Sequence, residues 1–298
     1  MRKNYVLTVL GKNWNQEHAR SLFAEAASQG LLVKSGEVCP LAGSSLWMQR
    51  SWATASAELG AAELERLASC ADAAGLDLFV EPEELFHTPR KLFVFDMDST
   101  LIQAEVIDEL AGLAGVKGEV SAITAAAMRG EIDFPTSLTR RVSLLRGIPE
   151  NSIWKLTSQI SLGEGLVNLV AGLKSAGCKT AILSGGFGFF GRHLQERLGF
   201  HDLYANELEI SAGLLTGRLA AAIVDGNRKA EALREVAHRE AICLQEVVAV
   251  GDGANDLPML ALAGTGVAYH AKPIVRAAAS FRLNHCGLDA LLHLLNRG

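Results

Sequence analysis

Asp96 and Asp98 are two carboxylates one residue apart, and they follow an apolar run typical of a buried strand, KLFVFDMDST. In open parallel sheets, ligands bind outside the carboxyl ends of the strands, where these side chains are expected. One carboxylate there can attack phosphorus and form an acyl phosphate, while the other protonates a leaving oxygen and then deprotonates water. Aspartate is also common in turns and helix caps, so the pair alone leaves a plain turn open.

Two further strand ends carry groups suited to phosphate and metal. The run ILSGG ends in Ser184, Gly185 and Gly186, whose hydroxyl and exposed amides can hold phosphate oxygens. The run VGDGANDLPML places Asp252 and Asp256 at another strand end. Carboxylates without imidazole or thiolate favour Mg²⁺ over zinc.

Lys229 lies near the start of a predicted helix in DGNRKAEAL, where it could reach a phosphate as a point charge. Taken singly, each segment also fits an ordinary loop or a solvated side chain. The occurrence of all these segments in one chain, in this order, is far more specific than any one of them. It predicts a site in which Mg²⁺ and Lys229 neutralise Asp96 and Asp98 around a phosphoryl group.

Alternating strands and helices must position these residues from Lys91 onward. The apolar runs KLFVFD, KTAILSGG and EVVAVGDG are followed by predicted helices in EVIDELAGLAG, FGRHLQERLG and NDLPMLALAG. This order predicts an α/β fold with a Rossmann-like parallel sheet covered on both faces. The segment from about 105 to 164 has no clear strand, so we expect a helical insertion after the first strand.

Residues 1–88 have a different pattern. Strands are predicted in NYVLTVLG, LLVKSGEVCP, SLWMQRSWAT and LDLFVEP, and helices in NQEHARSLFAEAASQG and GAAELERLASCADAAG. The order βαββαβ describes a compact α+β unit. The stretch EPEELFHTPR has two prolines and few apolar residues, which indicates a linker. We therefore expect two domains, 1–88 and 89–298.

Composition narrows the classes of function. The net charge of −5 is not clustered, so nothing favours nucleic acid or an anionic membrane as a partner. No apolar run of about 18 residues occurs, and the start does not resemble a signal peptide, so we expect no membrane span and a cytoplasmic location. Five dispersed cysteines without CxxC spacing favour reduced thiols over disulfides or a zinc site.

Residues 91–298 resemble the haloacid-dehalogenase (HAD) superfamily, and within it the phosphoserine phosphatase family. The superfamily resemblance rests on DMDST, LSGG, Lys229 and GDGAND. The closer resemblance rests on DMDSTLIQAE, which extends the first motif to a substrate-binding glutamate at Glu105. It also rests on MRGEIDFPTSLTRRVSLLRG, which is similar to the family's cap segment.

The resemblance implies Mg²⁺-dependent hydrolysis of O-phospho-L-serine, the last step of serine biosynthesis. It makes Asp96 the nucleophile and Asp98 the general acid/base. Asp96, the backbone carbonyl of Asp98 and Asp252 would hold Mg²⁺, and Asp256 would support the water shell of the metal.

The resemblance also assigns the groups that hold the substrate. Those implied for the phosphoryl group are Ser184, the Gly185 amide and Lys229, and Asn255 would contact this group or the bound substrate. Glu105 would pair with the substrate ammonium and Arg141 with its carboxylate, while Phe134 and Met128 help to close the pocket. These two charged roles are chemically consistent, because a zwitterionic amino acid is bound by one anion at its ammonium and one fork-shaped cation at its carboxylate. From the residues alone, Arg141 could equally be a solvated arginine and Glu105 an acid in the first turn of a helix. Phe134 and Met128 could equally be core residues.

Residues 1–88 resemble the ACT-like domains fused to many phosphoserine phosphatases. The turn LGKNWNQEH lacks the Asp-Arg-Pro-Gly pattern of ligand-binding ACT domains, so binding of serine or another ligand and a dimerisation or structural role both stay open. We expect a homodimer, with this domain as one candidate interface.

Two other functions fit parts of this sequence. One is a related phosphatase or phosphotransferase acting on another small phosphomonoester, such as phosphohomoserine. Glu105 and Arg141 argue against a substrate without an amino acid group. The other is a serine-sensing regulatory protein without activity, against which the intact catalytic motifs argue.

Overall fold

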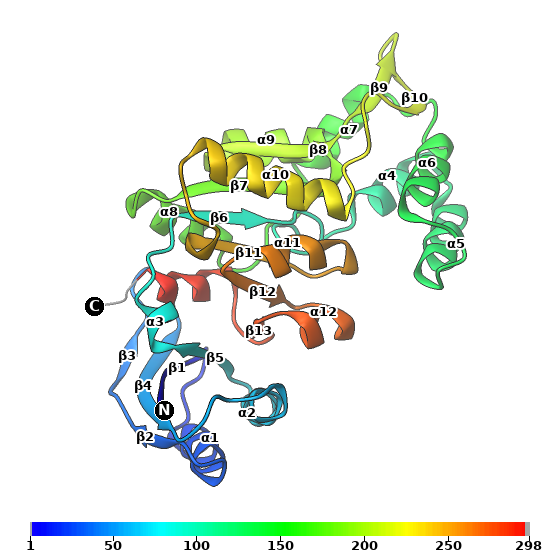
Figure 1. The fold of residues 1–298 in the computed structure, drawn as a ribbon. Coiled ribbons are helices and arrows are strands. Elements are labelled where there is room, and N and C mark those ends of the chain that lie inside the picture. Colours follow the sequence, from blue (N-terminus) through cyan, green and yellow to red (C-terminus); the bar gives the residue numbers. More distant parts are fainter. Residues whose placement is uncertain (1, 296–298) are drawn as a thin grey trace.

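The computed structural model describes residues 2–295, and its largest element is a six-stranded sheet with helices on both faces (Figure 1). The strand order is β13-β12-β11-β6-β7-β8, and every neighbouring pair is parallel. Its strands are β6 (Leu92–Phe95), β7 (Lys179–Phe187), β8 (Asp202–Asn206), β11 (Val247–Gly251), β12 (Thr265–Tyr269) and β13 (Phe281–Leu283). The predicted α/β fold class is confirmed.

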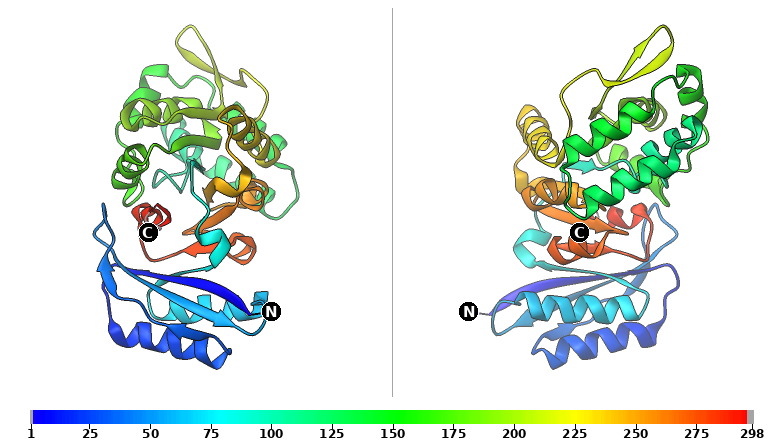
Figure 2. Two further views of the ribbon diagram at one scale, coloured as in Figure 1. Left: turned by 60° about the vertical axis from the view of Figure 1, so that its left-hand side comes forward. Right: turned by 90° about the vertical axis from the view of Figure 1, so that its right-hand side faces the viewer.

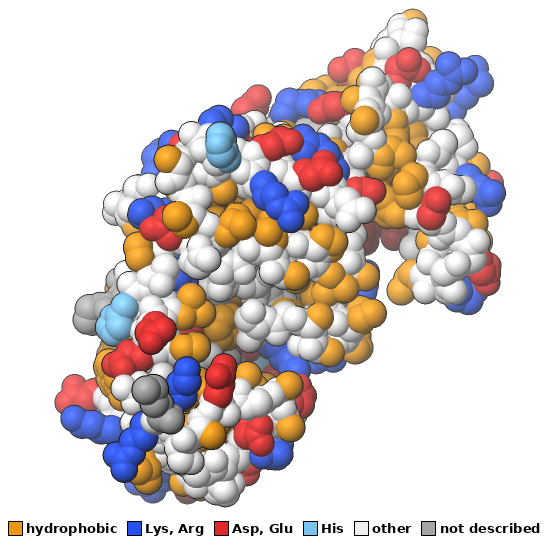
Figure 3. Space-filling model, viewed as in Figure 1, with side chains coloured by type: hydrophobic (Ala, Val, Ile, Leu, Met, Phe, Trp, Pro, Cys, Tyr) orange, Lys and Arg blue, Asp and Glu red, His pale blue; other side chains and the backbone are white. Residues whose placement is uncertain are grey.

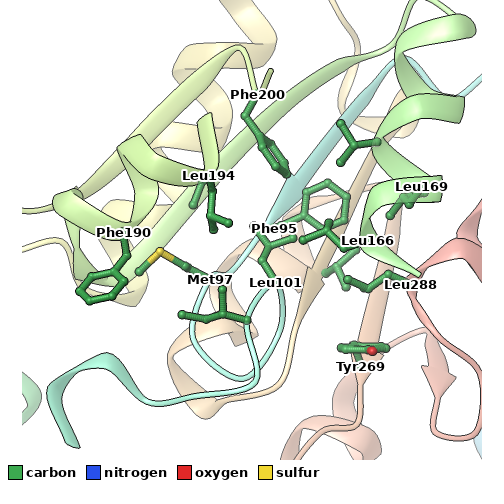
Figure 4. Packing of buried hydrophobic residues seen from close by; sticks show 14 of the residues in the cluster. Phe95, Met97, Leu101, Leu166, Leu169, Phe190, Leu194, Phe200, Tyr269 and Leu288 are labelled. Carbon is green, nitrogen blue, oxygen red and sulfur yellow. The ribbon is translucent and has the colours of Figure 1, made fainter. Parts of the chain in front are cut away.

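Helices cover the two faces because successive strand residues point in opposite directions. In β6, Leu92 and Val94 pack in the cluster that includes α10 and α11. Phe93 and Phe95 face the other way and pack with α8 and α9. Figure 4 shows Phe95 in this second core, where its ring meets Phe200 edge-on at 6.0 Å. The α-helices that accompany this sheet are α8 (Leu166–Ser175), α9 (Gly188–Leu198), α10 (Gly226–Arg239), α11 (Leu257–Leu262) and α12 (Pro273–Ala278). Three short 3-10 helices belong to the same part of the chain: η1 (Leu244–Glu246), η2 (Ala254–Asp256) and η3 (Leu288–Leu294).

A helical insertion leaves the sheet after β6 and returns before α8, as predicted, and we refer to it as the cap. Its helices are α4 (Val106–Ala114), α5 (Lys117–Met128), α6 (Phe134–Leu144) and α7 (Glu150–Thr157). The outgoing and returning segments meet at an antiparallel bridge between Ile102 and Leu162. This bridge holds both ends of the cap beside the carboxyl edge of the sheet.

A hairpin that the sequence analysis did not predict packs against the cap (Figure 1). It is formed by β9 (Leu208–Ser211) and β10 (Leu214–Leu219). The backbone of Leu215 exchanges hydrogen bonds with Gly147 and Ile148 at the end of α6. The turn is Ala212-Gly213, with φ of 53° and 76°. It therefore has the backbone of a type I′ turn without the usual Asn-Gly signal.

The N-terminal part forms an antiparallel sheet of order β2-β4-β1-β5, with β3 also paired to β4. Its elements are β1 (Lys3–Gly11), α1 (Gln16–Ser28), β2 (Leu32–Lys34), β3 (Val38–Pro40), β4 (Trp47–Ala55), α2 (Ala61–Ala73) and β5 (Asp77–Pro82). The strand predicted over 31–40 is thus split in two. At the break, a Cβ on Gly36 would lie 1.9 Å from the carbonyl oxygen of Arg50, so only glycine fits there.

One face of this sheet packs on α1 and α2, and part of the other packs on β13 and η3 (Figure 2). Phe79 stacks on Phe281 with ring centroids 4.8 Å apart. The Asp77 carboxylate accepts backbone N–H bonds from residues 284–286. The two sheets therefore share part of one apolar core, and the predicted division at residue 88 stays a prediction.

The predicted linker is more ordered than its composition indicated. It contains a one-turn helix, α3 (Glu83–Phe86), whose Phe86 side chain is buried. Glu81 and Arg90, the first and last residues of this linker, form a buried ion pair at 3.2 Å. None of the helices formed by residues 2–295 is long and apolar enough to cross a lipid bilayer.

Candidate active site

Lys229 lies at the centre of a buried charge cluster at the carboxyl edge of the six-stranded sheet. Its Nζ is 2.7 Å from Asp96 Oδ1 and 2.6 Å from Asp256 Oδ1. Asp96 directly follows β6, and Asp256 belongs to η2 after β11. The helix α10 carries Lys229 in its first turn, and its N-cap Asp225 accepts the Arg228 amide. Three elements distant in sequence thus bring one cation between two carboxylates.

Burial shapes the ionisation of this cluster. Burial and the neighbouring Asp256 raise the pKa of Asp96 to about 7, although Lys229 opposes the rise. Burial also disfavours the charged form of Lys229, but Asp256 and Asp96 outweigh it, so the pKa of Lys229 is raised. Lys229 therefore stays an ammonium and holds Asp96 in place.

Asp98 has the environment of a proton donor. Its Oδ1 is buried and has no hydrogen-bond partner among the described residues. Burial, followed by the charges of Glu105 and Asp96, raises the pKa of Asp98 well above its usual range. The raised pKa favours the protonated form of Asp98, which can donate a proton to a leaving oxygen.

The segment Ser184–Gly186, at the end of β7, faces the two aspartates. The Ser184 Oγ accepts the Gly186 amide at 2.9 Å. A Cβ on Gly186 would lie 2.7 Å from Asp98 Oδ2, so glycine is required for this approach. The result is a concave strand end lined by a hydroxyl and small residues beside Asp96 and Asp98.

Asn206, which the sequence analysis missed, fixes this strand end from behind. Its amide donates to the Gly185 carbonyl at 2.8 Å, and its Oδ1 accepts the Val224 amide at 2.8 Å. It therefore ties the end of β7 to the loop that leads into α10. The only sequence signal was a polar residue at the end of a short apolar run.

Three buried carboxylates, from Asp96, Asp252 and Asp256, have oxygens within 4.8 Å of one another. Both Asp256 oxygens are already bonded, Oδ1 to Lys229 and Oδ2 to the amides of Asp252 and Gly253. For Asp96 and Asp252, no hydrogen bond within residues 2–295 involves Oδ2. The donor set is all oxygen, which fits Mg²⁺, with Asp96 and Asp252 as the carboxylates best able to bind it.

Asp252 is also held by a residue that the sequence analysis missed. Thr100, buried in the loop after Asp98, donates its hydroxyl to Asp252 Oδ1 at 3.3 Å. Burial, Asp256 and Glu105 raise the pKa of Asp252 to about 6, and Lys272 and Lys229 oppose the rise. A bound divalent cation would favour the ionised form of this carboxylate.

The cap presents two charges to the same space. Glu105 occupies the N-cap position of α4, and its Oε1 accepts the Ser99 hydroxyl at 2.9 Å. Ser99 has a φ of 57°, an uncommon backbone conformation that sends the chain from Asp98 toward Glu105. Arg141 is half-buried on α6 and forms no ion pair with any carboxylate of residues 2–295. Burial lowers the pKa of Arg141, and Glu105, Asp108 and Asp98 act in the opposite direction.

These groups converge on one pocket between the cap and the sheet. Figure 3 shows an indentation between the α5–α6 end of the cap and the α12 side of the sheet. The lining residues come from both sides: Asp96, Asp98, Glu105, Ile107, Phe134, Leu138, Arg141, Ser184, Gly185, Gly186, Phe187, Asp252, Gly253, Asn255 and Lys272. Most residues predicted from the sequence are therefore together, and Lys272 is an addition.

Two predicted site residues are not on the pocket wall. Lys229 is beneath the pocket rather than on its wall, because its ammonium is held by Asp96 and Asp256. Met128 ends α5, is 72% exposed and is not among the lining residues. Phe134, by contrast, reaches the sheet, since a Cβ on Gly185 would lie 3.1 Å from its ring.

Known proteins share both the sequence and the fold. A model of the haloacid dehalogenase-like hydrolase family matches residues 93–261. The chain is 47% identical over 233 residues to a phosphoserine phosphatase from Archaeoglobus fulgidus, covering 77% of this chain and 68% of that protein. It is 45% identical over 227 residues to a phosphoserine phosphatase from Polaromonas sp., covering 74% of this chain and 96% of that protein.

A solved structure matches nearly the whole chain. It is a probable phosphoserine phosphatase from Vibrio cholerae, with a TM-score of 0.79 at 36% identity. The match covers 98% of this chain and 86% of that one. The N-terminal sheet therefore has a counterpart in that protein, whereas about three quarters of this chain match almost all of the Polaromonas relative.

Proposed function

The chain belongs to the haloacid dehalogenase-like hydrolase family, and from this membership we propose that it is a phosphoserine phosphatase. It hydrolyses O-phospho-L-serine to L-serine and phosphate through an aspartyl phosphate, the last step of L-serine biosynthesis. The observation that carries this proposal is one pocket with two distinct walls. The sheet edge supplies Asp96, Asp98 and Ser184, and the cap supplies Glu105 and Arg141.

The first chemical step is a displacement at phosphorus. A carboxylate oxygen of Asp96 attacks the phosphorus atom, and the bond from phosphorus to the serine oxygen breaks. Asp98 gives its proton to that oxygen as serine leaves. In the second step a water molecule attacks the phosphorus of the aspartyl phosphate and gives a proton to Asp98. The bond from phosphorus to the Asp96 oxygen breaks, which regenerates the Asp96 carboxylate and releases phosphate.

The charge on the phosphoryl oxygens is met by fixed groups of the chain. The Ser184 hydroxyl and the Gly185 amide bind it from β7, Lys229 contributes its ammonium from below, and Asn255 contacts it from η2. Asp96, the backbone carbonyl of Asp98 and Asp252 would hold Mg²⁺, with Asp256 supporting its waters, and when bound the ion supplies further positive charge.

The cap reads the amino acid part of the substrate. Glu105 pairs with the ammonium, and Arg141, with no carboxylate partner among the described residues, pairs with the carboxylate. Phe134 covers the pocket above Gly185. Met128 reaches the substrate only if the end of α5 moves toward the sheet, because its side chain is exposed here.

A phosphate-release assay with Mg²⁺ across a panel of phosphomonoesters tests the proposal. The panel contains phosphoserine, phosphothreonine, phosphohomoserine, glycerol phosphate and glucose phosphate. We expect phosphoserine to give the highest kcat/KM. Higher turnover of a sugar or glycerol phosphate would overturn the assignment, because those substrates have no use for Glu105 and Arg141.

We also propose that residues 1–88 form an ACT-like domain and that the protein is a cytoplasmic homodimer. The ACT-like assignment is supported by the packing of α1 and α2 on one face of an antiparallel sheet. Light scattering of the full chain and of a chain that starts at residue 89 tests whether the N-terminal domain carries a dimer interface. Two monomeric samples would count against it.

A further inference from the structure

Lys272 is a pocket residue with no role in the chemistry derived so far. It follows β12, whose carboxyl end lies beside that of β11 in the sheet, and it precedes α12. Its backbone amide donates to the carbonyl oxygen of Asp252 at 3.0 Å, which fixes its Cα next to that residue. Lys272 lines the pocket together with Asp252, Gly253 and Asn255.

The charge balance of the pocket gives Lys272 a reason to be there. Four acidic side chains line the pocket, Asp96, Asp98, Glu105 and Asp252, and the two cations on its wall are Arg141 and Lys272. The charge of Lys229 is already matched by two carboxylates. Even with Asp96 paired to Lys229, the carboxylates of Glu105 and Asp252 line the space that a phosphate dianion enters, so a cation on the pocket wall favours its entry.

The two wall cations stand on opposite sides of the pocket. Arg141 belongs to the cap, near Glu105, where the amino acid part of the substrate is proposed to lie. Lys272 belongs to the sheet edge, near Asp252 and Asn255, on the phosphate side. Its side chain is exposed and forms no ion pair within the described part of the chain. An unpaired ammonium on a flexible stem is suited to an anion that must enter and leave.

We propose that Lys272 is a substrate-binding residue that contacts the phosphate dianion as it enters the pocket and holds inorganic phosphate before release. The inference rests on the proposed phosphatase function and deepens it. The contact is made outside the reacting position, because the groups around Asp96 are Ser184, Gly185 and Lys229. Lys272 therefore affects binding of substrate and product and leaves the barrier of the chemical steps nearly unchanged.

Steady-state kinetics of Lys272→Met and Lys272→Arg test this role, with Lys174→Met as the control. Lys174 is exposed on α8 and lies outside the pocket. In Lys272→Met, we expect the KM for phosphoserine and the inhibition constant of inorganic phosphate to rise together, by roughly five- to twenty-fold, with kcat within about threefold of wild type. Lys272→Arg should recover most of the loss, and Lys174→Met should match wild type.

Two further readings separate binding from other roles. The difference between wild type and Lys272→Met should shrink as sodium chloride is raised, because salt screens the charge at the pocket mouth. The Mg²⁺ concentration for half-maximal activity should stay unchanged. If that concentration shifts while the phosphate inhibition constant does not, Lys272 acts on Asp252 and the inference is wrong.

The same data distinguish this inference from the proposed function. An inactive wild type with all phosphomonoesters would overturn the phosphatase assignment itself. An active wild type whose Lys272→Met variant behaves like Lys174→Met would leave the assignment intact and refute the role of Lys272.

Discussion

At the sheet edge, Asp96, Lys229 and Asp256 are buried and bonded to one another. On the cap, Glu105 is exposed and Arg141 has no carboxylate partner among residues 2–295. The first set is fixed before any substrate arrives, which is the arrangement that stabilises charge in a transition state. The second set leaves its charges to be matched by a ligand. The contrast supports the proposal that the sheet edge performs the phosphoryl chemistry and the cap selects the phosphomonoester.

The largest effect is expected from replacing the nucleophile at the sheet edge. Asp96→Asn should lower kcat by about 10⁴-fold or more, because an amide of nearly the same shape is a poor nucleophile. The fold should be retained, since burial already disfavours the charge of Asp96. Phosphate release and thermal melting measure both outcomes. Substantial activity in freshly purified Asp96→Asn, before deamidation can restore aspartate, would contradict the covalent route.

The buried cluster should also matter to stability, unlike charges on the surface. Lys229→Met leaves Asp96 and Asp256 buried without their cation, so we expect the free energy of unfolding to fall by about 3–5 kcal/mol. The neighbouring Arg228→Met removes exposed pairs with Glu235 and Glu231 and should cost about 1 kcal/mol or less. Urea denaturation compares the two. Equal losses would remove the distinction between a fixed and an adaptable set of charges.

Metal binding at the sheet edge should depend on pH. Burial raises the pKa of Asp96 to about 7 and of Asp252 to about 6, so both bind protons more tightly in the metal-free folded state than in the unfolded chain. Without Mg²⁺, the stability that this cluster contributes is therefore largest near pH 4 and is lost as pH rises toward about 7. Mg²⁺ must displace these protons when it binds. Its affinity should therefore weaken by about tenfold for each unit that the pH falls, for each proton displaced.

Thermal melting with and without Mg²⁺ at pH 5.5 and pH 8 measures this dependence. The increase in Tm caused by Mg²⁺ should be larger at pH 8, and Asp252→Asn should reduce it. An equal increase at both pH values would mean that Asp96 and Asp252 are not the groups that the metal deprotonates.

The strand-end motifs predicted which sheet-edge residues the structure brings together, and the physical reason is local. Asp96, Ser184 and Asp252 lie at the carboxyl ends of apolar strand segments, so parallel pairing brings them together. Asn206 and Thr100 could not be found in this way, because their partners are the Gly185 carbonyl and Asp252, which are distant in sequence. The hairpin of β9 and β10 was missed because Ala212 occupies a turn position that usually calls for asparagine or glycine.

The cap half was accessible only through family resemblance. An exposed Glu105 and a half-buried Arg141 have no local pattern that separates them from solvated charges. Met128 shows the limit of this approach. The resemblance places it near the pocket, whereas the structure exposes its side chain at the end of α5. Whether Met128 reaches the ligand depends on the position of the end of α5 relative to the sheet, which the spacing of residues does not encode.

The smallest effects are expected at the apolar edge of the cap. Phe134→Ala removes a ring that lies against Gly185, so kcat/KM for phosphoserine should fall by roughly 10- to 100-fold. Met128→Ala should change it by less than about threefold, because an exposed side chain has little to lose. A loss in Met128→Ala as large as that in Phe134→Ala would show that the cap closes far enough to bring Met128 onto the substrate.

The most direct test of the division between sheet edge and cap is the Arg141→Ala variant assayed with two substrates. For phosphoserine, loss of the partner of a buried carboxylate costs about 2–5 kcal/mol, so kcat/KM should fall by roughly 30- to several thousand-fold. For p-nitrophenyl phosphate, which has neither ammonium nor carboxylate, it should change by less than about threefold. Arg140→Ala, the neighbouring exposed arginine, should leave both values near wild type. Equal losses with both substrates would contradict the account, because Arg141 would then serve the fold or the phosphoryl group.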